Sequence, residues 1–246
     1  MQAYFTIIIP ALNEEKLLPR LLQALKNQSY KNFEVILVDA NSTDKTVSKA
    51  EEFAVDFALT LLHTNIKNIS ASRNMGALKA KGKYIFFVDA DNYIHPEFLK
   101  GMAALLKKEY EMIIPAVVPD SERSIYTIGY SAVNFLVLIG KKFGVPFSTG
   151  GNFIIKKTIF EKLHGFDETI YVGEDHDIVE RARKMKVKIA FSPHHKVVCS
   201  VRRLDKEGWT VLFKYFVSTL YIAFFGKITK KIYDYQMGGD YYKKQN

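Results

Sequence analysis

The sequence of 246 residues contains a single cysteine, Cys199. One cysteine cannot form an intramolecular disulfide, and free cysteines in proteins are mostly interior. We therefore expect Cys199 to be a small buried side chain without redox chemistry, and the cysteine content gives no indication of an oxidising compartment.

The sequence also lacks the features of export and of membrane insertion. Its first ten residues, MQAYFTIIIP, have no basic region followed by an apolar stretch and a small-residue cleavage site, as a secretory signal peptide would. It contains no clean run of about 20 apolar residues, the length that a transmembrane helix requires. We expect a cytoplasmic protein without an integral membrane domain.

Acidic residues are too few to balance the basic ones, and the net charge is +9. Basic proteins bind nucleic acid, anionic lipid or phosphorylated substrates, and the total charge does not distinguish these partners. Residues 202–246 contain nine Lys and Arg against four Asp and Glu, a net charge of +5. We attribute this basic end to lipid headgroups and expect no nucleic-acid partner, which salt-dependent oligonucleotide binding would test.

The first half of the sequence alternates short β-rich runs with longer amphipathic segments, which is typical of βαβ units and a parallel sheet. We expect strands near Tyr4–Ile9, Phe33–Val38, Leu59–His63 and Tyr84–Val88. Helices are expected over Glu14–Asn27, from an N-cap at Ser42 or Thr43 to about Phe53, and over Ser70–Ala80.

The second half is less regular. Strands are expected near Met112–Val118, Phe153–Lys156, Val187–Phe191 and Val197–Val201, and helices near Thr158–Leu163 and Asp175–Lys184. With 48% hydrophobic residues, the chain can bury one substantial core. We expect one α/β domain, with an open, mainly parallel twisted sheet flanked by helices.

Two aspartates, Asp89 and Asp91, follow the apolar run YIFFV. Ligands of open α/β sheets collect beyond the carboxyl ends of strands. Alternate residues of an extended segment point to one side, so both carboxylates could bind one Mg²⁺ or Mn²⁺ ion, which would neutralise a departing diphosphate. Acids spaced in this way are also common in solvated turns.

A second acidic group, Glu174, Asp175 and Asp177, opens a predicted helix. Acidic side chains in a first helical turn interact favourably with the helix dipole, so helix capping is one interpretation. The other is a general base that removes the proton of an acceptor hydroxyl. The residues by themselves leave both interpretations open.

Five segments, in order, resemble the family 2 glycosyltransferases of the GT-A fold. They begin with TIIIPALNEE and FEVILVDANSTDKT, continue with SASRNMGALKAKGKYIFFVDADNYIHPEFL, and end with GGNFIIKKTIFEKLHGFDE and GEDHDIVERAR. The resemblance covers roughly Phe5 to Phe191. It implies a Rossmann-like domain over 1–205, with a nucleotide-binding half at about 1–95 and an acceptor half at about 96–205. It also implies transfer of a sugar from a UDP- or GDP-sugar by inverting single displacement.

The same resemblance implies a set of donor nucleotide contacts: Pro10, Ala11, Asn13, Glu14, Asp39, Arg73, Asp89 and Ala90. Asp89 and Asp91 would hold Mn²⁺ or Mg²⁺. Asp175 would be the catalytic base with Glu174 as its neighbour, and Asp177 would be structural or face the acceptor. Simpler explanations remain for some of these residues, since Asn13 could cap a helix and Arg73 could be a surface helix residue.

Seven further residues are candidates for the diphosphate, the acceptor or the metal: Gly150, Gly151, Asn152, Arg202, Arg203, His194 and His195. The glycines permit close backbone approach to a ligand, and a simple turn is equally consistent. The arginine pair could hold a diphosphate through charge-assisted hydrogen bonds or form surface ion pairs. His195 is a candidate metal ligand, although paired loop histidines are commonly solvated.

Two segments have partial membrane character. Residues 125–140 are uncharged, which suits an interfacial helix or a buried helix equally. Residues 209–228 add aromatic and aliphatic side chains to a basic extension over 206–246, which we expect to be helical. A helix that closes the core would look similar. We expect peripheral attachment to the cytoplasmic face of a membrane, with a glycan or lipid-linked acceptor.

Two other functions would use a similar framework. A sugar-phosphate nucleotidyltransferase usually has a glycine-rich phosphate loop after its first strand, whereas this sequence has PALNEE there. A non-catalytic, membrane-associated binding protein of the same fold would not need both acidic groups, and both are present.

Overall fold

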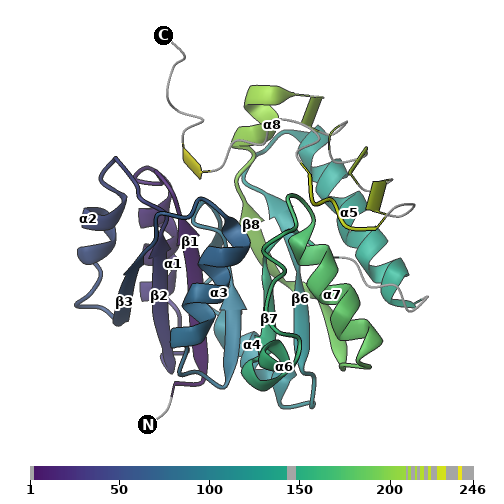
Figure 1. The fold of residues 1–246 in the computed structure, drawn as a ribbon, viewed down its shortest axis with the longest axis horizontal. Coiled ribbons are helices and arrows are strands. Elements are labelled where there is room, and N and C mark those ends of the chain that lie inside the picture. The colour runs from purple at the N-terminus through teal and green to yellow at the C-terminus, as the bar shows by residue number, and fades with distance from the viewer. Residues whose placement is uncertain are drawn as a thin grey trace.

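The apolar runs form the strands of one sheet in the computed structural model, which describes residues 3–142, 148–208, 210–211, 214, 217–218, 221–222, 226–230 and 238–239. Within these residues, the strand order is β3-β2-β1-β4-β7-β6-β8-β5. Strands β3, β2 and β1 lie side by side at one end of the sheet (Figure 1). The strands are β1 Phe5–Ala11, β2 Phe33–Asp39, β3 Ala58–His63, β4 Tyr84–Phe87, β5 Tyr93–Ile94, β6 Met112–Pro119, β7 Phe153–Lys156 and β8 Ile189–Cys199.

Helices cover both faces of this sheet (Figure 1). They are α1 Leu18–Lys26, α2 Thr46–Glu51, α3 Ile69–Lys79, α4 Phe98–Leu106, α5 Ser124–Lys142, α6 Lys157–Lys162, α7 Glu174–Lys184 and α8 Arg202–Glu207. Successive strand residues point to opposite faces, so Ile7 packs in the cluster that contains α1 and α4, and Ile8 packs with α3, α6 and α7. The two clusters form the core on either side of the sheet.

The N-terminal half of the sheet is parallel, as expected. β1 pairs in parallel with β2 and β4, and β2 pairs in parallel with β3. The second half is mixed, because β7 runs antiparallel to both β4 and β6, while β6 and β8 are parallel. The carboxyl ends of β1, β2 and β4 therefore meet at one edge of the sheet.

Two helix starts differ from the prediction. α1 begins at Leu18 rather than near Glu14, because Asn13 has the left-handed φ of 54° and the chain turns before the helix begins. α2 begins at Thr46 with Lys45 at its N-cap, so the predicted capping by Ser42 or Thr43 is wrong. Both side chains contact the loop after β1 instead.

The two strands predicted over Val187–Phe191 and Val197–Val201 are one bulged strand, β8. Its pairing with β6 jumps from Ser192 to Lys196 between two consecutive β6 residues. The extra residues form a β-bulge, which bends the strand and breaks the alternation that sequence patterns rely on.

The C-terminal extension over 206–246 lies mostly outside the described residues. The described parts contact the domain: Ile228 bridges to Val172, and Gly239 N donates to the carbonyl oxygen of Leu12 at 2.9 Å. The boundaries at 95 and 205 stay predictions. Across the described ranges, no helix has both the length and the apolar character needed to span a membrane.

Candidate active site

Hydrogen bonds join the loop after β1 to the loop after β2. Asn13 Oδ1 accepts a bond from Thr43 N at 2.8 Å, and Asn13 N donates to Ser42 Oγ at 2.8 Å. Glu14 N donates to Thr46 Oγ1 at 2.7 Å. The polar residues of NSTDKT thus fix the ends of two neighbouring strands, where open α/β sheets bind their ligands.

Asp39 lies at the end of β2 beside these loops. Its carboxylate is buried and accepts a hydrogen bond from Ser42 N at 3.2 Å, and His63 Nδ1 lies 3.5 Å from Oδ2. Pro10 and Ala11 end the adjacent strand β1 and pair with Val38 and Asp39. Pro10, Ala11, Asn13 and Asp39, which are expected to border the nucleotide, therefore lie together at the carboxyl ends of β1 and β2.

Arg73 on α3 is the largest fully buried side chain among the described residues, with 1% exposure. Its Nη2 lies 2.8 Å from Asp89 Oδ1, and its Nη1 lies 2.7 Å from Glu174 Oε1. Burial alone lowers the pKa of an arginine, but Asp89 and Glu174 outweigh it and raise the pKa of Arg73 above its ordinary value. One guanidinium therefore bridges the two acidic groups, and the alternative of a surface helix arginine is wrong.

Gly151 leaves the space that this guanidinium occupies. A Cβ atom built on Gly151 would lie 1.8 Å from Arg73 Nη2, far inside van der Waals contact. By contrast, a Cβ atom on Gly150 would meet no atom within 4 Å, although its φ of 73° favours glycine. The backbone of this loop therefore approaches the Arg73 side chain closely at Gly151.

Asp91 forms an ion pair with an arginine that is distant in the sequence. Arg202 Nη2 lies 3.0 Å from Asp91 Oδ2 and 2.5 Å from Glu14 Oε1. Burial raises the pKa of Asp91, and Arg202 and Arg203 act against this rise. Burial likewise raises the pKa of Glu14 to about 7, partly offset by Arg202. The expected arginine pair lies beside the aspartates, with Arg202 inside the cluster.

The loop that contains Asn152 supports the segment after the aspartate pair. Asn152 is buried, and its Oδ1 accepts a hydrogen bond from Asn92 Nδ2 at 2.9 Å. Asn152 Nδ2 lies 3.9 Å from Cys199 Sγ. Burial, together with the charges of Asp91 and Asp89, raises the pKa of Cys199 well above its ordinary value. Cys199 is partly buried and stays a protonated thiol behind the site.

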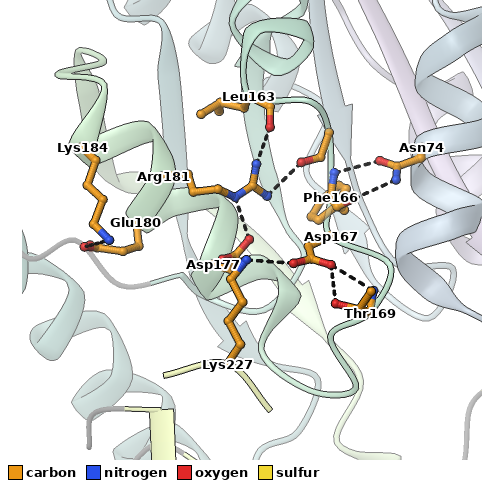
Figure 2. A network of polar contacts seen from close by, with 11 residues as sticks. Asn74, Leu163, Phe166, Asp167, Thr169, Asp177, Glu180, Arg181, Lys184 and Lys227 are labelled. Carbon is orange, nitrogen blue, oxygen red and sulfur yellow. Dashed lines mark hydrogen bonds and ion pairs between the residues drawn. The ribbon is translucent and has the colours of Figure 1, made fainter. Parts of the chain in front are cut away.

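Asp177 belongs to a polar network that fixes the start of α7 (Figure 2). Its Oδ2 lies 2.7 Å from Arg181 Nε, and its Oδ1 lies 3.1 Å from Lys227 Nζ. Lys227 also contacts Asp167 at 2.8 Å, and Arg181 Nη2 donates to the carbonyl of Gly165 at 2.8 Å. These contacts favour the structural role for Asp177.

Asp175 is different from its neighbours. It is half-buried, and its carboxylate forms no hydrogen bond or ion pair with any residue that the structure describes. Burial raises the pKa of Glu174, and the adjacent Asp175 carboxylate raises it further. Of the two acids, Glu174 is paired with Arg73, whereas Asp175 has no such partner among the described residues.

His195 lies in another part of the molecule. The β8 bulge packs its ring against α4, where a Cβ atom on Gly101 would lie 2.0 Å from His195 Nε2. His195 Nδ1 lies 2.8 Å from Ser192 Oγ, and burial lowers the pKa of His195. His194 and His195 line a pocket of about 500 Å³ with Lys100. We therefore leave His195 out of the candidate metal ligands.

The donor set at Asp89 and Asp91 fits a hard divalent cation. The two side chains are 33% and 21% exposed, and each keeps a second carboxylate oxygen besides the one that contacts an arginine. In the described part of the chain, no group of three or more His, Cys, Asp or Glu could hold a metal. Mg²⁺ and Mn²⁺ commonly complete their coordination with substrate phosphates and water. Two carboxylates therefore suit an ion held jointly with a diphosphate.

Solved structures with a similar fold extend this description. The structure is similar to the mannosyltransferase PcManGT from Pyrobaculum calidifontis in complex with GDP-Man and Mn²⁺, with a TM-score of 0.72, 22% identity, and coverage of 89% of this chain and 62% of that chain. It is also similar to TarS 1-349 of Staphylococcus aureus in complex with UDP-GlcNAc, with a TM-score of 0.66, 21% identity, and coverage of 81% and 58%. The expected fold is confirmed: the α/β sheet flanked by helices is that of the GT-A glycosyltransferases.

Sequence relatives point to the same class. Poly(ribitol-phosphate) beta-N-acetylglucosaminyltransferase TarS of Staphylococcus aureus is 33% identical over 114 residues, which are 45% of this chain and 20% of TarS. An uncharacterized glycosyltransferase of Haemophilus influenzae is 26% identical over 201 residues, 77% of this chain and 64% of that protein. The chain thus spans only part of each relative.

Family models match most of the chain. The model of glycosyl transferase family 2 matches residues 6–164, and a model described as the N-terminal domain of galactosyltransferase matches residues 134–203. The chain belongs to glycosyl transferase family 2, as its motifs predict.

Proposed function

We propose that the protein transfers a sugar from a UDP- or GDP-sugar to a hydroxyl of a glycan or lipid-linked acceptor, with inversion at the anomeric carbon. The main support is the pair of carboxylate groups that Arg73 joins, Asp89 at the end of β4 and Glu174 beside Asp175 at the start of α7. The solved complexes of TarS with UDP-GlcNAc and of PcManGT with GDP-Man and Mn²⁺ support a nucleotide-sugar donor.

On the donor side, the nucleotide would lie along the ends of β1 and β2, beside Pro10, Ala11, Asn13 and Asp39. Asp89 and Asp91 would hold Mn²⁺ or Mg²⁺, which supplies positive charge for the leaving diphosphate when bound. Arg202 and Arg203 stand next to Asp91. A guanidinium there would donate charge-assisted hydrogen bonds to phosphate oxygens.

Arg73 has a different proposed role from the one that resemblance implies. Since its guanidinium is 1% exposed and both Nη atoms form ion pairs, we propose that it positions Asp89 and Glu174 instead of contacting the nucleotide. A planar guanidinium presents two donors in fixed directions, which suits the bridging of two carboxylates. Gly151 then serves the site by leaving room for it.

On the acceptor side, Asp175 is the proposed general base. The acceptor oxygen attacks the anomeric carbon while the bond from that carbon to the diphosphate oxygen breaks, and the hydroxyl proton moves to the Asp175 carboxylate. The diphosphate leaves with the electron pair of the broken bond. No covalent intermediate on the protein is required, and one displacement inverts the configuration.

We further propose that the protein is peripheral on the cytoplasmic face of a membrane. The support is the basic C-terminal region and the uncharged stretch at residues 125–140. Anionic headgroups attract basic residues near the surface.

A donor panel tests the proposed activity. Uridine, guanosine and thymidine diphosphate sugars would each be added with Mn²⁺ or Mg²⁺, and thermal stabilisation and donor hydrolysis would be measured. We expect one uridine or guanosine donor to raise the melting temperature in a metal-dependent way and to be hydrolysed slowly. No response to any donor would contradict the proposed function.

A further inference from the structure

Helix α5 exposes an apolar surface to solvent. Six of the exposed large apolar side chains of the described residues lie on this one helix: Ile125, Ile128, Val133, Phe135, Leu136 and Leu138. Single exposed apolar residues are ordinary on protein surfaces, but a contiguous group marks an interaction site. The alternative that residues 125–140 form a buried helix is therefore wrong.

The inner side of α5 is anchored to the sheet. Asn134 Oδ1 accepts a hydrogen bond from Val117 N at 2.9 Å, and Asn134 Nδ2 donates to the carbonyl of Val117 at 2.7 Å. Val137 is buried in the core three residues further on. These contacts fix which side of the helix faces outward, and Figure 1 shows α5 at the outer edge of the molecule.

The composition of this helix and the net charge of the protein favour an anionic partner. The helix has no Asp or Glu, and the protein has a net charge of +9. Apolar helices in a basic setting bind the interface of anionic membranes, where the apolar side inserts among the acyl chains.

The size of the surface does not suit a stable dimer. A helix of 19 residues is about 28 Å long and about 10 Å wide, a footprint of about 280 Å². A standard protein interface buries about 800 Å² on each partner. Binding to a bilayer requires no minimum area of this kind, because each inserted apolar side chain contributes separately to the free energy of binding.

A short series of contacts connects α5 with the active site. At the N-terminal end of the helix, Tyr126 Oη donates to Asp205 Oδ1 at 2.8 Å, and Arg123 Nη1 lies 3.1 Å from the same oxygen. Asp205 lies on α8, as does Arg202, which contacts Asp91 at 3.0 Å. The exposed apolar surface and the candidate site therefore share α8 as a neighbour.

We propose that the outward side of α5 binds the interfacial region of an anionic bilayer and holds the active site next to the membrane surface. Ile128, Phe135 and Leu136 insert at the boundary between the headgroups and the acyl chains, and the basic residues of the chain contact the anionic lipids. The consequence for the acceptor rests on the proposed function: a lipid-linked hydroxyl reaches Asp175 without leaving the membrane surface.

The test compares vesicle binding of two exposed double variants. Phe135→Ser with Leu136→Ser changes α5, where the two side chains are 59% and 58% exposed. The matched control, Val55→Ser with Leu78→Ser, changes side chains that are 90% and 83% exposed elsewhere on the surface. Binding would be measured by co-sedimentation with vesicles of phosphatidylcholine and phosphatidylglycerol at a ratio of 3:1, and of phosphatidylcholine alone, at low salt.

We expect the wild type and the control to bind the anionic vesicles, and the α5 variant to bind at least about tenfold less, since one lost apolar insertion weakens partitioning by that order. Equal binding by all three proteins, or no binding by the wild type, would overturn the proposal. So would a wild-type dimer in sedimentation velocity that the α5 variant abolishes, because the surface would then bind a second copy.

The donor panel distinguishes a failure of the membrane proposal from a failure of the proposed function, because donor response and vesicle binding are measured independently. The α5 variant should retain the melting temperature and the donor response of the wild type, because its changes lie outside the site. Loss of vesicle binding in this variant would support the membrane surface even if no donor responded. If the double variant fails to fold, the single variant Ile128→Ser takes its place, and its vesicle binding is compared with that of the wild type in the same way.

Discussion

The two acidic groups of the candidate site differ in how their carboxylates are held. Asp89 and Asp91 each contact an arginine from a distant segment, Arg73 and Arg202. In the second group, Glu174 shares Arg73, whereas the carboxylate of Asp175 forms no hydrogen bond or ion pair within the described chain.

This difference corresponds to two chemical tasks. Carboxylates that support a leaving diphosphate must keep one position, and a guanidinium holds them there through charge-assisted hydrogen bonds. A general base must be free to approach a hydroxyl and to receive its proton. The unpaired acid is therefore the better candidate for the base, and the paired acids are the better candidates for the metal side.

The largest expected effect comes from removing the proton acceptor. Asp175→Asn keeps the size of the side chain but cannot take a proton, so kcat should fall by about 100- to 10,000-fold. The control is Asp177→Asn, which removes an acid that Arg181 and Lys227 already pair. It should lower the melting temperature and cost less than tenfold in kcat. Similar losses of kcat in both variants would remove the distinction between the two acids.

The second effect concerns the bridge between the groups. Arg73→Met leaves two carboxylates without their counter-charge, and breaking a buried ion pair in this way costs about 3–5 kcal/mol of unfolding free energy. Urea unfolding would measure it. Arg20→Met is the control, because Arg20 and Asp120 form an exposed pair that should contribute about 1 kcal/mol or less. Equal losses would show that the Arg73 bridge contributes no more than a surface pair.

A smaller effect is expected from filling the space beside Arg73. The Cβ atom of Gly151→Ala would lie 1.8 Å from Arg73 Nη2, and overpacking of this kind costs about 1–3 kcal/mol. The rate of transfer should fall as well, because the guanidinium must move away from Asp89. Gly129→Ala on α5, where no atom lies within 4 Å, should leave both stability and rate nearly unchanged. An unchanged rate in Gly151→Ala would show that the position of Arg73 does not matter.

Sequence patterns predicted the parts of the fold that repeat locally. The strands β1, β2 and β4 follow from their apolar runs, and the helix α1 follows from the spacing of its leucines. The ends of those strands predict where the site lies. The bulge of β8 was missed because three residues outside the alternation look like an ordinary break between two strands. The side of α5 that faces solvent could not be predicted either, since an uncharged helix gives no polar stripe to orient it.

The partners of the charged residues were the least predictable part of the site. Arg73 contacts Asp89 and Glu174, which are 16 and 101 residues away in the chain, and Arg202 contacts Glu14 at a separation of 188 residues. Such pairs depend on the sheet order and leave no local pattern. One signal was present: small residues, Ser70, Ser72 and Gly76, surround Arg73 on α3, which indicates close packing of that helix.

Calorimetric titration of the responding donor into Asp91→Asn and Asp175→Asn, with and without Mn²⁺, tests most directly whether the two acidic groups act at opposite ends of the displacement. Because Asp91 belongs to the leaving-group side and Asp175 to the attacking side, Asp175→Asn should bind the donor with the affinity and metal dependence of the wild type. Asp91→Asn should lose the metal-dependent part of the binding. Metal-dependent binding that survives in Asp91→Asn, or that disappears in Asp175→Asn, would contradict the assignment of the two acidic groups to opposite ends of the displacement.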